Sequence, residues 1–145
     1  AESIRYDFDD VEVKYAAELT EVIRANAQNT VDKLNELLTR AERTDIDRLN
    51  SGWRPRSVNA SISNASTSSK HLTAEAGDIP DGDRTLAHWC ADHQDVLVEL
   101  ELWFEDFRWA PTWVHAQIVP PKSGKRIYVP SLKEPLDPTF PVTWA

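Results

Sequence analysis

Cysteine is almost absent from this sequence. Cys90 is the only cysteine among 145 residues, so the chain forms no internal disulfide and has no cysteine-rich structural zinc site. A Gly-x-Ser-x-Gly turn, which presents the serine nucleophile in many hydrolases, is missing as well. Any metal ion bound by this chain must therefore use histidine, aspartate or glutamate.

The sequence also lacks a long apolar run and an excess of positive charge. No stretch approaches the ~20 apolar residues that cross a bilayer, so no membrane span is expected. The formal net charge is −8, whereas a nucleic-acid binder needs a clustered cationic surface, so nucleic acid is not an expected partner. The first residues lack the layout of a secretory signal, but a cleaved signal leaves no trace, so the location is left open.

Length and patterning predict a single domain, 1–145, that behaves as a monomer. Apolar residues three and four apart predict an N-terminal helical region at about 9–43, as one helix or as two broken around 26–29. A core at about 46–130 follows. The Pro-rich tail, 131–145, is expected to run extended and to pack Phe140 and Trp144 on the body.

The core alternates short β-prone segments with one helical pattern. Strands are expected in Ile46–Arg54, Leu72–Ile79, Glu101–Phe107, Thr112–Val119 and Arg126–Pro130. Asp83–Leu100 predicts a helix that breaks near His93, and the segment 57–69 is rich enough in Ser and Asn to be an exposed loop. This order predicts an α+β fold with a small, mainly antiparallel sheet packed against helices.

Three short segments carry the candidate chemistry: "SGWRP" at 51–55, "SSKHLTAEAGD" at 68–78 and "TWVHAQ" at 112–117. His71 and Asp78 alone are a weak signal, because acidic residues occupy 24 of 145 positions. Together the segments resemble the M15 peptidases, zinc D-Ala-D-Ala carboxypeptidases and L-alanyl-D-glutamate endopeptidases, whose fold is also that of the hedgehog signalling domain. The resemblance spans about Ala27–Pro130 and is closest to short phage and bacterial members.

The family pattern Ser-x-His-x(2)-Gly-x-Ala-x-Asp falls on Ser69, His71, Ala74, Ala76 and Asp78. The departure is Ala74, where the family has glycine, and it matters if the backbone there has a positive φ. The resemblance implies one Zn²⁺ per chain, held by His71, Asp78 and His115. Two imidazoles and one carboxylate suit a catalytic zinc, which keeps a fourth position for water.

The general base is not fixed by the resemblance. Many relatives place an acidic residue three positions before the last histidine ligand, and here that position is Thr112. The strand expected to pair with "TWVHAQ" offers Glu105, which a hairpin brings beside His115, with Asp106 as the alternative. A base at Glu105 should have a raised pKa from partial burial.

Four further residues are candidate contacts for substrate. Arg54 matches the family's arginine near the site, and its guanidinium suits a substrate carboxylate or a developing oxyanion. Ser69 is expected to bind substrate or to cap its loop. Gln117 and Trp113 share a sheet face with His115 and are expected to line the cleft, Trp113 as a wall or as core.

The resemblance implies hydrolysis of an amide bond in the peptide stem of bacterial peptidoglycan, by a phage lysin, a virion-associated wall enzyme or a bacterial wall-remodelling peptidase. Such an enzyme acts on the cell wall and is phage-encoded or exported. The alternative is a non-catalytic zinc-binding module that recognises the wall or serves as a phage structural component. The departures at Thr112 and Ala74 motivate that alternative.

Overall fold

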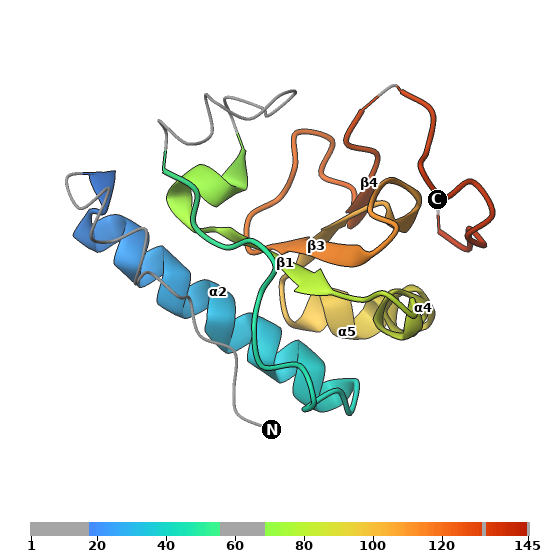
Figure 1. The fold of residues 1–145 in the computed structure, drawn as a ribbon, viewed down its shortest axis with the longest axis horizontal. Helices are drawn as coiled ribbons and strands as arrows, with labels where there is room; N and C mark the ends of the chain where they lie inside the picture. The colour runs from blue at the N-terminus through green and yellow to red at the C-terminus, as the bar shows by residue number, and fades with distance from the viewer. Residues whose placement is uncertain (1–17, 56–68, 132, 145) are drawn as a thin grey trace.

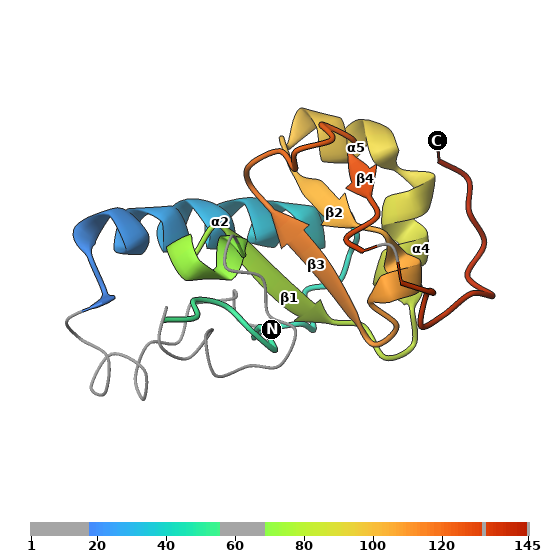
Figure 2. The same ribbon diagram turned by 90° about the horizontal axis from the view of Figure 1, so that it is seen from above.

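The computed structural model describes residues 18–55, 69–131 and 133–144. In this part of the chain, three helices lie on one side of a four-stranded sheet with the strand order β1-β3-β2-β4 (Figures 1 and 2). The α+β class is confirmed, and two of the three strand pairings are antiparallel, as expected. The specific likeness to the peptidase and hedgehog fold stays a prediction.

The N-terminal helical pattern forms one unbroken helix, α2, Glu21–Arg40. The Thr20 side chain accepts the Ile23 amide at its start, and acidic Glu21 and basic Arg40 occupy the ends that the helix dipole favours. Six residues of one helix face are buried: Ala27, Thr30, Val31, Leu34, Leu37 and Leu38. The expected beginning of the helical region near residue 9 lies outside the described residues.

Four short strands make the sheet: β1 (Ala76–Pro80), β2 (Trp103–Glu105), β3 (Trp113–Gln117) and β4 (Ile127–Tyr128). The central strand β3 pairs antiparallel with β1 on one side and with β2 on the other, and β4 adds to β2 in parallel. The segments expected to contain β2, β3 and β4 are therefore confirmed as strands.

The sheet has one apolar and one polar face because side chains alternate along each strand. The lower face in Figure 1 joins the core through five residues that are at most 4% exposed: Ile79, Phe104, Val114, Ala116 and Ile127. A Cβ on Gly77 would lie 3.0 Å from Leu34 and from Leu49, so glycine lets α2 approach β1 closely. The opposite face carries the candidate functional residues.

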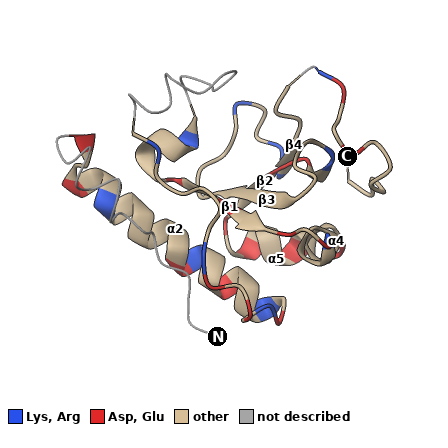
Figure 3. Ribbon diagram, viewed as in Figure 1, with Lys and Arg blue, Asp and Glu red and all other residues tan. Residues whose placement is uncertain are grey.

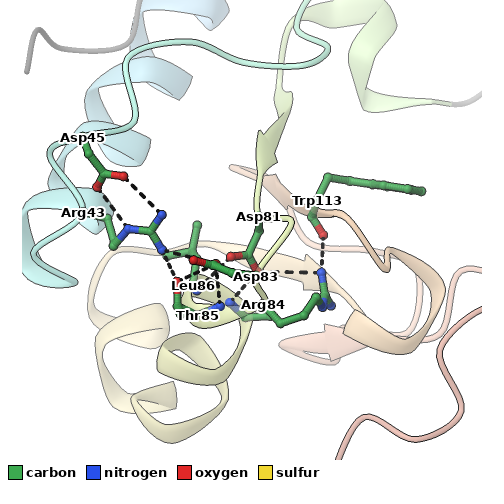
Figure 4. A network of polar contacts seen from close by, with 9 residues as sticks. Arg43, Asp45, Asp81, Asp83, Arg84, Thr85, Leu86 and Trp113 are labelled. Carbon is green, nitrogen blue, oxygen red and sulfur yellow. Dashed lines mark hydrogen bonds and ion pairs between the residues drawn. The ribbon is translucent and has the colours of Figure 1, made fainter.

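Two helices, α4 (Thr85–Asp92) and α5 (Gln94–Glu99), cover the rest of the apolar face and meet at His93. The expected break near His93 is therefore confirmed. Figure 4 shows the polar contacts before α4: the buried carboxylate of Asp81 accepts the amides of Leu86 and Ala87, each at 2.9 Å, and Asp83 accepts the Thr85 amide. These bonds satisfy amides that a helix start leaves without partners.

Two strand predictions need correction. Ile46–Arg54 is not a strand, since it meets the sheet only through an isolated bridge between Ser51 and Asp78. The alternation there reflects burial of Ile46 and partial burial of Leu49 without a continuous strand partner. Leu72–Ile79 begins as a 3-10 helix, η2 (Lys70–Thr73), and becomes strand only at Ala76. The expected loop, 57–69, lies outside the described residues except for Ser69.

The C-terminal tail packs as expected. Phe140 is buried against Phe107, with ring centroids 5.6 Å apart, and Trp144 contacts both rings. Among the described residues, no helix combines the length and apolar character needed to cross a membrane.

Candidate metal centre

The three predicted metal ligands meet on the polar face of the sheet. His71 comes from η2, Asp78 from β1 and His115 from β3, where Asp78 and His115 are directly paired across the strands. His71 Nε2 lies 3.3 Å from one carboxylate oxygen of Asp78, and His115 Nδ1 lies 2.9 Å from the other. One potential ligand atom from each residue lies within 4.8 Å of the others, so this cluster could hold a metal ion.

The segment that contains Gly52 and Arg54 orients His71. The Gly52 carbonyl lies 2.8 Å from His71 Nδ1, and because a carbonyl only accepts, Nδ1 carries the proton. Nε2 is therefore the ring nitrogen that faces Asp78 and is available to a metal. The Arg54 amide donates to the His71 carbonyl at 2.9 Å, and the Ser69 hydroxyl accepts the His71 amide at 3.3 Å. These contacts hold one ligand in place before any metal binds.

Ala74, the position at which the resemblance expects glycine, has a φ of 58°. It ends η2 in the left-handed region, a conformation that glycine adopts more readily than alanine. Helix α2 supports this turn, because Asn26 donates to the Thr73 carbonyl and the Thr30 hydroxyl donates to the Ala74 carbonyl at 2.7 Å. Ala74, which stands where the family has glycine, thus lies in a strained turn between the candidate ligands His71 and Asp78.

The carboxylate at the centre of the cluster stays ionised. Burial would raise the pKa of Asp78, but hydrogen bonds from His115 and His71 hold it well below its usual range. Burial also opposes the charged form of His115, yet the bond to Asp78 raises its pKa overall. A buried anion with an imidazole on each side is a setting that favours a bound cation.

The donor set suits zinc. Two imidazole nitrogens and one carboxylate oxygen leave a fourth tetrahedral position open, as in catalytic sites. A tetrahedral zinc with bonds of about 2.0–2.1 Å separates its ligand atoms by roughly 3.3 Å. The 3.3 Å and 2.9 Å distances reach two different oxygens of Asp78, and the three candidate ligand atoms lie within 4.8 Å of one another, so a small adjustment of the side chains would bring them to this spacing. The residues therefore fit the metal that the sequence suggests.

Glu105 lies beside the cluster at the end of β2. Its strand pairs Trp103 with Gln117 and Phe104 with Ala116, and the next step of this register places Glu105 opposite His115 on the polar face. Burial raises the pKa of Glu105 to about 7, with smaller contributions from the charges of Asp78 and Asp106, while His115 acts in the opposite direction. The expected raised pKa is present.

Asp106, the alternative base, has another role in the fold. Its carboxylate accepts the amide and guanidinium of Arg108, at 2.8–3.0 Å, and the indole N–H of Trp144 at 3.2 Å. It is 1% exposed. Asp106 thus caps the short 3-10 helix η3 (Phe107–Trp109) and anchors the tail.

The four candidate substrate contacts lie around the same sheet. Gln117 is buried, and Trp113 is partly buried at the start of β3, where its carbonyl accepts Arg84 (Figure 4). Arg54 and Ser69 are partly buried beside His71. Two contacts were not predicted from the sequence: the Gly52 carbonyl contacts His71, and the Tyr128 hydroxyl donates to Gln117. Neither a backbone oxygen nor a tyrosine two strands away has a local sequence signature.

Comparison with known proteins leaves this geometry as the main support for the centre. No family model matches the chain, and neither a curated protein nor a solved structure matches it. The chain is therefore best characterised by its site: three converging side chains that could hold a metal ion on one sheet face, with a partly buried glutamate of raised pKa on the adjacent strand.

Proposed function

We propose that this protein is a zinc hydrolase that cleaves an amide bond in the peptide stem of bacterial peptidoglycan. The observation that carries the proposal is the pairing of Glu105 with the His71, Asp78 and His115 cluster. A pKa near 7 lets one carboxyl group both accept and donate a proton at neutral pH. The resemblance to M15 peptidases supplies the substrate class.

The chemistry divides between the metal and the protein. Bound zinc supplies a Lewis acid and lowers the pKa of a coordinated water. Glu105 takes the proton from the attacking water and returns it to the leaving amine. Arg54 offers a planar guanidinium for a substrate carboxylate or for the negative charge that develops on the carbonyl oxygen.

The distribution of charged residues supports an anionic substrate. A peptide stem with free carboxylates is anionic. The protein is acidic overall, yet Lys70 and the residues Lys122, Lys125 and Arg126 lie in η2 and in the loop between β3 and β4. Figure 3 shows these cationic segments above the sheet, whereas α2 below it carries both acidic and basic residues. Ser69, Gln117 and Trp113 remain the proposed neighbours of substrate.

One observation favours a second function. Thr112 stands where many relatives have their base, which fits a zinc-binding module that recognises the cell wall, or a phage structural component, without hydrolysis. Glu105 discriminates between the two functions, because a binding module has no need of a buried carboxyl group beside the metal.

The test is zinc-dependent release of peptide fragments from purified peptidoglycan. We expect release by the wild type and a loss of about 10²–10⁴-fold in Glu105→Gln, as for removal of a general base. Both proteins should hold stoichiometric zinc by plasma mass spectrometry. Glu134→Gln, at an exposed tail residue, is the matched control and should retain activity.

Fragment masses identify the bond that is cleaved. A zinc-loaded wild type that releases no fragments, yet sediments with peptidoglycan, would establish the binding module instead. Equal activity of Glu105→Gln and wild type would remove Glu105 from the mechanism.

A further inference from the structure

A chain of hydrogen bonds runs from a backbone carbonyl to the metal ligand His115. The Gln117 amide nitrogen donates to the Val119 carbonyl at 2.9 Å. The Gln117 oxygen lies 3.0 Å from His115 Nε2 and accepts the Tyr128 hydroxyl at 2.7 Å. Gln117 is 3% exposed, so water does not compete freely for these groups.

The carbonyl end of the chain sets the orientation of the amide. A carbonyl oxygen can only accept, so it requires the NH₂ group of Gln117. Turning the amide around would place the Gln117 oxygen against the Val119 oxygen at the same 2.9 Å, with two acceptors facing each other in a buried setting. The amide oxygen therefore points to His115 and Tyr128.

The orientation of the amide then determines which nitrogen of His115 carries its proton. The Gln117 oxygen accepts, so His115 Nε2 must donate. Without a metal, Nδ1 also donates to Asp78 at 2.9 Å; a bound cation would replace the Nδ1 proton and leave the Nε2 proton in place. The Tyr128 hydroxyl donates to the same Gln117 oxygen and so supports this orientation of the amide. The Gly52 carbonyl does the equivalent for His71, through its Nδ1.

We propose that Gln117, oriented by Val119 and Tyr128, is a positioning residue that fixes the proton of His115 on Nε2 and directs Nδ1 to the metal. This inference rests on the proposed metal centre but not on hydrolysis. It gives Gln117 a role in metal binding that differs from the substrate contact suggested by its place in the sequence.

The test compares the zinc affinity of purified variants by competition with a chromophoric chelator. Gln117→Met keeps the length and approximate volume of the side chain but removes the amide. We expect it to weaken zinc binding by about 10–100-fold, the usual effect of losing a group that orients a ligand. Tyr128→Phe should fall between wild type and Gln117→Met.

A spectroscopic measurement separates positioning from packing. In the zinc-loaded wild type the Nε2 proton of His115 should give a resolved resonance that exchanges slowly with water, and Gln117→Met should lose this protection. Gln94→Met is the control, because Gln94 also donates its amide to a backbone carbonyl, of Ala91, away from the cluster. It should leave both measurements unchanged.

The outcomes distinguish this inference from the proposed function. Zinc binding by Gln117→Met within threefold of wild type overturns the positioning role alone. A wild type that binds no zinc overturns the metal centre and this role together. A wild type that binds zinc without cleaving peptidoglycan leaves the positioning role intact and overturns only hydrolysis.

Discussion

The two faces of the sheet are built on different physical principles. The face toward the helices is apolar, and its side chains are held by contact with many neighbours in one core cluster. The opposite face is polar, and specific hydrogen bonds hold the side chains of His115 and Gln117, and of His71 beside them. Packing on the apolar face is shared among many residues, whereas the arrangement of the polar face depends on single hydrogen-bonding atoms.

This contrast implies that substitutions on the two faces should fail differently. Loss of an apolar side chain should lower the free energy of unfolding and leave the identity of the site unchanged. Loss of a polar side chain should alter metal binding or hydrolysis with little destabilisation, or even with stabilisation. Three substitutions test the contrast, in order of decreasing effect.

Phe104→Ala should have the largest effect on stability. Phe104 is fully buried on the apolar face of β2, next to Glu105 in sequence but on the opposite side of the sheet. Removing the ring leaves a cavity, and we expect a loss of about 3–5 kcal/mol in the free energy of unfolding. Urea denaturation of the metal-free protein measures it. A loss below ~1 kcal/mol would contradict the core role of this face.

Glu105→Gln should act with the opposite sign, and only at high pH. The pKa of Glu105 is raised to about 7 in the folded protein from an ordinary value of 4.5, so the folded state binds this proton more tightly than the unfolded state does. Metal-free wild type therefore loses stability as the pH rises from 4.5 to 7. Glutamine carries no such penalty, so the variant should be more stable by up to about 3 kcal/mol at pH 8.

Denaturation at several pH values checks this sign. The two proteins should have equal stability near pH 4, where Glu105 is protonated in both states, and should diverge above pH 5. Bound zinc should reduce the difference, because a nearby cation favours the ionised carboxylate. A constant difference at all pH values would indicate a packing effect of the substitution and contradict the raised pKa.

The sequence predicted the residues of the site better than the backbone that presents them. The family resemblance implies the three ligands, and strand pairing adds Glu105. The structure brings the three ligand side chains together, and the register of β2 points Glu105 toward His115. The turn of η2 was mistaken for strand, because a 3-10 helix of four residues has no periodic apolar signal. The contacts made by Gly52 and Tyr128 could not be predicted from the sequence, because both depend on the tertiary structure.

Ala74→Gly should have the smallest effect on stability of the three substitutions. It tests a residue whose side chain packs in a core while its backbone leads to the candidate metal ligands. Alanine with a φ of 58° is strained by about 1 kcal/mol relative to glycine, which partly offsets the extra entropy that glycine loses on folding. The Ala74 methyl group is also buried, against Ala27 and Trp53, and its packing would be lost. We therefore expect a small net loss in stability, of less than about 1 kcal/mol.

The informative readout of Ala74→Gly is the metal rather than the stability. The turn at Ala74 lies between His71 and Asp78, so relief of its strain should leave zinc affinity within threefold if α2 alone fixes the turn, through Asn26 and Thr30. Ala74→Val is the matched opposite, because a β-branched residue disfavours a positive φ strongly. It should destabilise the fold and weaken zinc binding together. Weaker zinc binding in Ala74→Gly would show instead that the methyl group, and not the hydrogen bonds from α2, holds the ligand turn in register.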